Sequence, residues 1–214
     1  MDEEIQTVSN SSRIANIKSF ILKNKKLLII IFTLIILSIF GYFIYKEYEK
    51  KQRIKLSERY NSAVTNFNSG DKQSAARELK EIIKKKDRTY SPLALYFLTD
   101  NSLIKSKEEI NSFFNLIIEE ISLEKEIKNL IIYKKALYNS DFETEQKLLN
   151  ILNPLINSES IWKSHALFLM AEYFYSKDEK QKSREFFQKI LELKNANQNI
   201  LLDTQKRIIR DFSE

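Results

Sequence analysis

The sequence predicts an all-α protein, with a single N-terminal transmembrane helix followed by a domain built from pairs of helices. Three observations carry this prediction. One long stretch, residues 27–45, contains no charged residue. The whole chain of 214 residues has only two Gly and two Pro, the residues that most often end helices. After residue 46, apolar residues recur at intervals of three and four, the period of one helix face.

Residues 27–45 have the length and composition of a membrane span. Fourteen of these 19 residues are Leu, Ile or Phe, and a helix of this length spans roughly 28 Å, close to the ~30 Å hydrocarbon core of a bilayer. Tyr42, Tyr45 and Tyr48 gather at one end, where aromatic rings favour the headgroup layer. A cleavable signal has a shorter apolar core and a small-x-small site after it, whereas this stretch runs directly into Lys46. The sequence therefore predicts a retained anchor.

The charges on either side of the anchor do not set its orientation. Five Lys and Arg residues precede it and six follow within a similar distance, so the excess that marks the cytoplasmic side is missing. The anchor divides a short tail, residues 1–26, from a domain of ordinary size, residues 46–214.

The composition of residues 46–214 excludes several kinds of site. There is no Cys and a single His, His165, so neither a thiolate site nor a histidine metal cluster can form. The 30 Lys and Arg exceed the 26 Asp and Glu only slightly and are spread along the chain, unlike the concentrated basic patch of a nucleic-acid-binding protein. Lys84–Lys86 ends a predicted helix, where cations complement the helix dipole.

Sequence motifs of catalysis are missing too. The chain has no Gly-rich phosphate loop, no H-E-x-x-H and no nucleophile elbow. Its adjacent acid pairs, such as Glu108-Glu109 and Glu119-Glu120, splay about 100° apart on a helix and suit a solvated face better than acid–base catalysis. We expect no enzymatic activity and no cofactor. An enzyme domain in a divergent fold stays open as an alternative.

Two stretches, residues 60–83 and 167–191, share one pattern of helix, short polar turn and helix. Their small residues, turn residues and apolar residues resemble the tetratricopeptide repeat. The matching residues are Ala63, Gly70, Asp71, Ala75, Leu79 and Ile82 in the first unit, and Ala171, Asp178, Glu179, Ser183, Phe187 and Ile190 in the last.

Two degenerate units lie between these two. One is centred on Leu98, Ile110, Phe114 and Ile117, and the other on Tyr133, Asp141, Leu149 and Leu152, with Glu145 at the usual small position. The unit starts step by 35, 35 and 38 residues, against 34 in the family. Residues 196–212 read as a capping helix with Ile200, Leu201, Ile208 and Ile209 on its packed face. The resemblance implies a tetratricopeptide-repeat-like α-solenoid; an unrelated helical bundle would give similar spacings.

A solenoid of this kind presents a concave surface to segments of other proteins. The repeat resemblance implies that partner-binding positions lie on the first helix of each pair. These positions are Tyr60, Val64, Phe67, Lys134, Tyr138, Phe168, Glu172 and Tyr175. Ordinary packing between neighbouring helices is the alternative role for the same side chains.

The order of the whole chain is a short acidic start, a basic stretch, one anchor and about 170 residues of degenerate repeats. With "MDEEIQ" and the "YNSAVTNF" unit soon after the anchor, it is similar to the YfgM-like ancillary subunits of the SecYEG translocon. The resemblance implies a bacterial inner-membrane protein with a cytoplasmic N-terminus and a periplasmic domain. Its partners would be translocon subunits and periplasmic chaperones, with residues 27–45 in the lipid bilayer and no nucleic acid. Another anchored repeat scaffold, for envelope assembly or cytochrome maturation, is the alternative.

Overall fold

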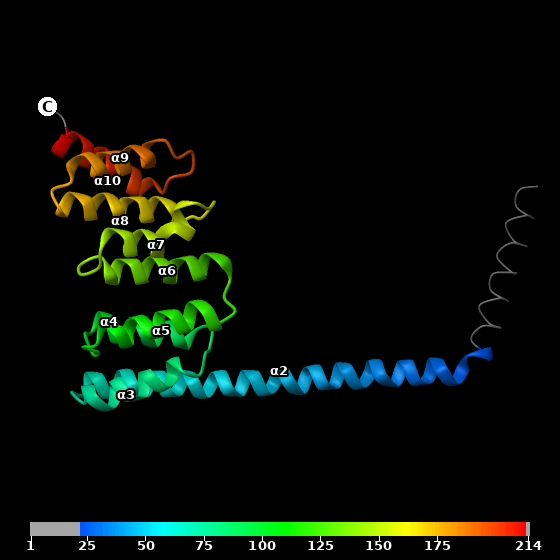
Figure 1. Cartoon of the computed structure of the whole chain (residues 1–214). Helices are drawn as coiled ribbons and strands as arrows, with labels where there is room; N and C mark the ends of the chain where they lie inside the picture. The colour runs from blue at the N-terminus through cyan, green and yellow to red at the C-terminus, as the bar shows by residue number, and fades with distance from the viewer. Residues whose placement is uncertain (1–21, 213–214) are drawn as a thin grey trace, which may run out of the picture. The chain divides into compact units, whose positions relative to one another are not determined.

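The computed structural model describes residues 22–212, and this part of the chain is helical with short connections. The prediction of an all-α fold is confirmed. The helices are α2 (Lys25–Asn68), α3 (Lys72–Ile83), α4 (Tyr90–Asp100), α5 (Lys107–Glu120), α6 (Lys125–Asn139), α7 (Glu145–Ile156), α8 (Lys163–Ser176), α9 (Lys180–Leu191) and α10 (Gln198–Phe212) (Figure 1). The chain divides into two compact units, Met1–Lys55 and Leu56–Glu214.

The first unit holds the apolar part of α2. The described Leu, Ile and Phe side chains of residues 27–45 are between 37% and 70% exposed. A helix that is apolar all round and makes no core of its own is suited to lipid rather than to water. This helix is long and apolar enough to cross a membrane, as predicted. The predicted tail, residues 1–26, lies mostly outside the described residues, and the boundaries 27–45 and 46–214 stay predictions.

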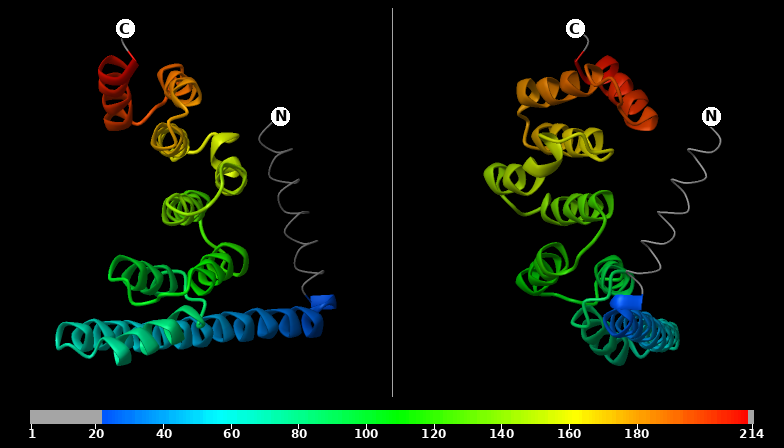
Figure 2. Two further views of the ribbon diagram at one scale, coloured as in Figure 1. Left: turned by 60° about the vertical axis from the view of Figure 1, so that its left-hand side comes forward. Right: turned by 90° about the vertical axis from the view of Figure 1, so that its right-hand side faces the viewer.

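The second unit is a stack of antiparallel helix pairs (Figure 2). The last turns of α2 pair with α3, since Ala63, Leu79 and Ile82 share one apolar cluster and Arg59 forms an ion pair with Glu78. The following pairs are α4 with α5, α6 with α7 and α8 with α9. We call the earlier member of each pair the first helix and the later member the second helix. The helices α4, α6, α8 and α10 begin at Tyr90, Lys125, Lys163 and Gln198, so successive starts lie 35, 38 and 35 residues apart. By this spacing, α10 stands where the first helix of a fifth pair would stand.

Small residues lie where paired helices meet. Ala63 and Ala75 are 0% exposed, and so are Ala171 and Ser183 at the corresponding places of the last pair. A small side chain lets two helix backbones approach closely, so that the larger apolar residues on either side interlock. The apolar side chains form three buried clusters that follow one another along the stack, and among residues 22–212 no single central core serves all the pairs.

The turn inside the first pair shows why Gly70-Asp71 stands there. Gly70 has φ +93°, a backbone conformation that residues with a Cβ adopt only at a cost. Asp71 is the N-cap of α3, and its carboxylate accepts a hydrogen bond from the backbone N–H of Ser74 at 3.0 Å. In the last pair Asp178 holds the glycine position with φ +60°.

The C-terminal helix α10 packs on the end of the stack, and its packed face differs from the one predicted for a capping helix. Ile200, Ile208 and Phe212 pack on the last apolar cluster, and Thr204 is fully buried on the same stripe. Ile209, expected on this face, is 69% exposed. The packed residues are every fourth residue from 200 to 212. Ile209 follows Ile208 directly and therefore points about 100° away from this stripe.

Candidate partner-binding surface

All eight predicted partner-binding residues are partly buried and lie on first helices. Seven of them, all except Val64, make a ring, cation or ion-pair contact with another segment of the described chain. Their contacts fall into three groups, on α2, α6 and α8.

Tyr60 and Phe67 join α2 to α4. The ring of Tyr60 lies 6.0 Å from that of Tyr90 and 6.4 Å from that of Phe97, and Phe67 meets Phe97 edge-on at 5.2 Å. Burial raises the pKa of the Tyr60 hydroxyl above its ordinary value. These rings therefore pack one first helix against the next, and Val64 lies between them in sequence, partly buried as well.

Lys134 and Tyr138 lie on the same helix, α6, but have different neighbours. The ammonium of Lys134 lies 5.6 Å from the ring centre of Tyr96, on the first helix of the preceding pair. The ring of Tyr138 instead contacts Phe114 of α5, at 6.2 Å, and Phe142, at 5.3 Å, after α6. Lys134 thus belongs to the row of first helices, whereas Tyr138 packs toward a second helix.

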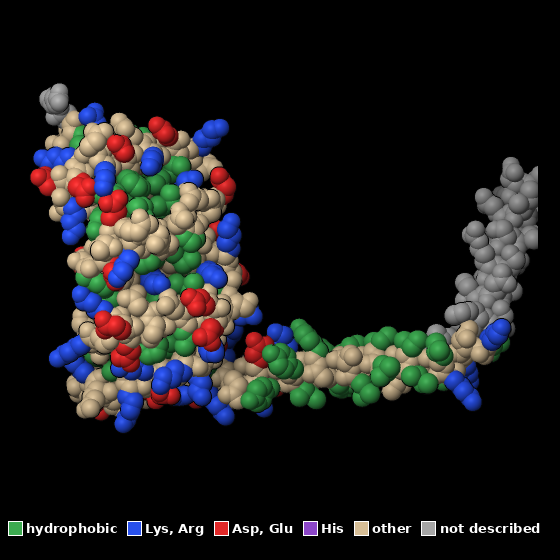
Figure 3. All heavy atoms as spheres, in the orientation of Figure 1, with side chains coloured by type: hydrophobic (Ala, Val, Ile, Leu, Met, Phe, Trp, Pro, Cys, Tyr) green, Lys and Arg blue, Asp and Glu red, His purple; other side chains and the backbone are tan. Residues whose placement is uncertain are grey.

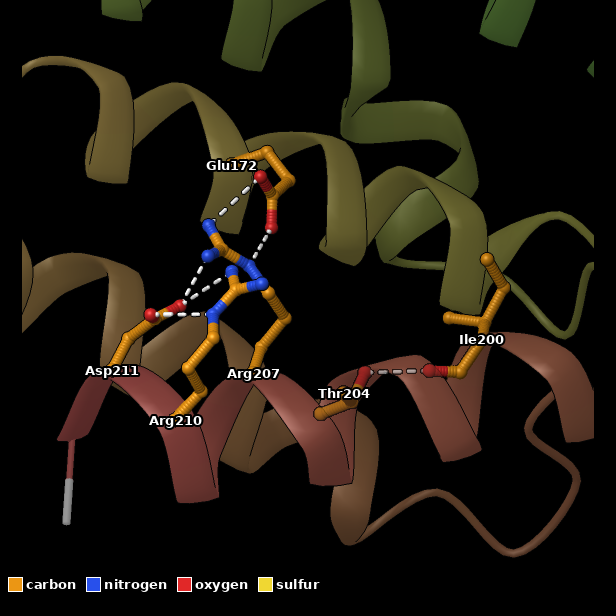
Figure 4. A network of polar contacts seen from close by, with 6 residues as sticks. All are labelled: Glu172, Ile200, Thr204, Arg207, Arg210 and Asp211. Atoms are coloured by element: carbon orange, nitrogen blue, oxygen red, sulfur yellow. Dashed lines mark hydrogen bonds and ion pairs between the residues drawn. The ribbon is translucent and has the colours of Figure 1, made fainter.

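The third group, on α8, is covered by α10. Arg207 of α10 binds both carboxylate oxygens of Glu172, through Nε at 2.6 Å and Nη2 at 2.9 Å (Figure 4). Its guanidinium carbon also lies 4.3 Å from the ring centre of Tyr175, and Phe212 meets that ring at 6.0 Å. Phe168 packs on Phe187 of its own pair partner. A partner that reaches Glu172 and Tyr175 has to compete with α10.

Figure 4 also shows what holds the arginine in place. Asp211 lies one turn after Arg207 on α10 and forms an ion pair with it, and Arg210 binds the same carboxylate at 2.8 Å. The buried hydroxyl of Thr204 donates a hydrogen bond to the backbone carbonyl of Ile200 at 2.7 Å, so it has a partner within the helix.

An aromatic cluster between α6 and α8 was missed by sequence reasoning. Trp162 stacks on Tyr133 at 5.8 Å, and His165 lies 5.0 Å from Trp162 and 5.7 Å from Tyr133. The indole N–H of Trp162 donates to the Glu126 carbonyl at 3.1 Å. Burial lowers the pKa of His165, against a smaller opposing effect of the Ile161 carbonyl. Only the spacing of Trp162 and His165, one helical turn apart, hinted at this contact.

Two open clefts lie away from the predicted positions. One, of about 640 Å³, is bounded by α5, the end of α6 and α7. At its base Asn111 and Asn139 exchange side-chain amide hydrogen bonds of 2.9 and 2.8 Å, and Lys107 lies 3.7 Å over the ring of Phe142. The other, of about 550 Å³, follows α3.

Within residues 22–212, no group of three or more His, Asp or Glu side chains lies close enough together to hold a metal ion. Glu109 and Glu120 each belong to an adjacent acid pair of the sequence, and both form ion pairs. Glu109 pairs with Lys80 at 2.8 Å, and Glu120 pairs with Lys86 at 2.5 Å. The first contact links the second helices α3 and α5, and the second links α5 to the turn that follows α3.

Comparison with known protein families agrees with this architecture. A family model described as a tetratricopeptide repeat-like domain matches residues 18–110. The first part of the chain, up to residue 110, is thus similar to a tetratricopeptide repeat-like domain. The match covers the apolar part of α2, the first pair, α4 and the beginning of α5. No curated protein and no solved structure matches the chain. Domains of this kind are typically non-catalytic scaffolds that bind other proteins.

Proposed function

We propose that this chain is a protein-binding scaffold held in the bacterial inner membrane by residues 27–45. The observation that carries the proposal is the extent of the family match, which runs from the apolar segment into the first helix pairs. A helix suited to lipid and a stack of helix pairs are thus parts of one matched segment. A membrane-fixed stack of this kind suits the capture of protein segments at the membrane surface.

The finer proposal follows from the layout of the chain, which resembles YfgM-like subunits. The protein is an ancillary translocon subunit that links SecYEG to periplasmic chaperones during export, with its N-terminus in the cytoplasm and its repeat domain in the periplasm. The row of first helices supplies the contact surface. Tyr60, Val64, Phe67 and Lys134 line its open part, and Phe168, Glu172 and Tyr175 become available where a partner replaces α10. Tyr138 lies one helical turn after Lys134 on α6 and packs toward the second helix α5.

Cross-linking in cells tests this proposal. A photoreactive amino acid replaces Lys134, on the first-helix row, and in a control it replaces Lys147, an exposed lysine of α7 that pairs with Glu143. After purification in mild detergent, we expect mass spectrometry to find translocon subunits and periplasmic chaperones attached at residue 134 and depleted at residue 147. Equal cross-linking at residues 134 and 147 would contradict the proposal that the first-helix row is the partner-binding site. Partners from envelope assembly or cytochrome maturation would favour the alternative scaffold.

Two further measurements test the anchor and its orientation. N-terminal sequencing of the mature protein should return the start of the chain, because the anchor is retained. Protease added to spheroplasts should digest the domain after residue 46. An N-terminus beyond residue 40 would mean that the anchor is cleaved, and complete protection of the domain until lysis would reverse the orientation.

A further inference from the structure

One face of α3 carries a regular pattern that the proposed function does not use. Lys72, Ala76, Lys80 and Lys84 recur every fourth residue and therefore form a stripe along the helix. The neighbouring stripe is Gln73, Arg77 and Glu81. Together with Leu103, from the connection between α4 and α5, these residues line the cleft of about 550 Å³, which we call the α3 groove.

The α3 groove is positively charged. Its lining has four cations and one carboxylate. Lys80 is paired with Glu109 at 2.8 Å and Lys84 with Glu81 at 2.7 Å. The cations also gather visibly at the end of the domain where α2 and α3 lie (Figure 3).

Two of the groove cations are left without a carboxylate. Within residues 22–212, neither Lys72 nor Arg77 has an acidic side chain within ion-pair distance. The ammonium of Lys72 lies 5.7 Å from the ring centre of Phe67, which holds it at the rim. Uncompensated charge beside a low-dielectric surface attracts carboxylates from a distance and fixes them on arrival.

The floor of the groove is apolar. Ala76 and Leu103 are partly buried between the charged walls, and the amide of Gln73 provides both a donor and an acceptor. A flat lipid surface touches protruding cations and would leave such a floor uncovered. A nucleic-acid backbone would bring phosphates against Glu81. A peptide fits both features, since it combines carboxylates, apolar side chains and backbone amides.

We propose that the α3 groove binds an acidic peptide segment of a partner protein. Carboxylates of the segment pair with Lys72 and Arg77, and an apolar side chain covers Ala76 and Leu103. The inference rests on the proposed scaffold function and adds to it the chemistry of a second contact, on a second helix rather than on the first-helix row.

The test uses the full chain in nanodiscs of phosphatidylcholine, which carry no net charge. The probe is a fluorescein-labelled twelve-residue peptide of Glu and Asp with two Leu one helical turn apart, followed by fluorescence anisotropy. The double variant Lys72→Glu/Arg77→Glu should raise the Kd about tenfold or more, since two favourable contacts become repulsive. Ala76→Leu fills the floor without changing any charge and should raise the Kd about fivefold.

The matched control is Arg184→Glu/Lys194→Glu, which makes the same charge change on and after α9. It should change the Kd by less than about twofold. Equal weakening by both double variants would overturn the proposal, because binding would then follow net charge alone. Tighter groove-dependent binding of a twelve-nucleotide RNA or of phosphatidylserine vesicles would also overturn it, in favour of a phosphate ligand.

The two experiments can contradict the groove proposal and the scaffold proposal independently of each other. If the cross-links at residue 134 persist and no variant alters peptide binding, the scaffold function stands and the groove proposal is wrong. If the peptide binds as described and no partner is recovered at residue 134, the groove stands and the first-helix surface is not the site.

Discussion

Arg207 of α10 and Glu172 of α8 form a two-point ion pair, in which Nε and Nη2 each donate to a different carboxylate oxygen, at 2.6 and 2.9 Å. The arginine side chain is only 13% exposed and lies over the ring of Tyr175. Paired geometry of this kind is stronger than a single surface contact, because both N–H groups are aligned at once. It fixes the capping helix on the same residues that we propose as part of the partner surface.

Arg207→Ala should loosen α10 and lower the free energy of unfolding by about 1–2 kcal/mol, through loss of the ion pair and of the contact with the rings. Urea unfolding of residues 46–214, followed by circular dichroism at 222 nm, measures the change. Arg210→Ala is the control, since Arg210 is 67% exposed and pairs with Asp211 next to it; its cost should stay below about 0.5 kcal/mol. Equal losses would show that Arg207 has no special part in docking α10.

Ala75→Leu should cost about 1–3 kcal/mol, because Ala75 is 0% exposed and a larger side chain there forces α3 away from α2. Ala76→Leu should matter less, since Ala76 borders the open α3 groove and the added atoms have room. Thermal melting of residues 46–214 by circular dichroism compares the two variants. If both melt at the same temperature, Ala75 is not a contact between the helices of the first pair.

The side-chain amides of Asn111, on α5, and Asn139, on α6, donate hydrogen bonds to each other, and Asn139 is 1% exposed. Asn139→Leu should therefore lower stability by about 1–3 kcal/mol, because it leaves the Asn111 amide without its partner. Replacing both by Leu should recover part of this loss, since no buried polar group then lacks a partner. A double-mutant cycle measures the coupling, and strictly additive effects would contradict the prediction.

His165 should make the domain less stable in mild acid. Burial lowers its pKa in the folded state, whereas the unfolded chain titrates near the ordinary value of about 6.5. As the pH falls, the unfolded state binds the proton first, so the free energy of unfolding decreases through about pH 6.5 and levels off below the folded-state pKa. Urea midpoints between about pH 7.5 and 5.5 measure this slope. His165→Phe should flatten it, and an unchanged slope in that variant would assign the effect to other groups.

Asp178 stands with φ +60° at the position that Gly70 holds in the first pair. Because a side chain there crowds the backbone, Asp178→Gly should raise the free energy of unfolding by about 0.5 kcal/mol. Gly70→Ala, at φ +93°, should lower it by about 1 kcal/mol for the same reason. Urea unfolding measures both changes. A loss of stability in Asp178→Gly, or a gain in Gly70→Ala, would contradict the prediction that a side chain crowds the backbone at this position of the turn.

Much of the fold could be predicted because its signals are local. The scarcity of Gly and Pro predicts continuous helices, and the uncharged run of residues 27–45 predicts a helix suited to lipid. Ala63, Ala75, Ala171 and Ser183 recur where paired helices meet, and the 35-residue spacing predicts the pairs themselves. Each of these signals needs only the period of a helix or the conformation of one residue.

The neighbours of each side chain were decided by the tertiary structure. Lys134 and Tyr138 are one helical turn apart, yet one lies beside a first helix and the other beside a second helix. Glu172 finds its partner 35 residues later in the chain, and Leu103 closes the α3 groove from a different helix connection. Periodicity predicts which residues share a face of one helix. What that face contacts depends on the stagger and crossing angle of two helices, and these arise from the packing of all their side chains together.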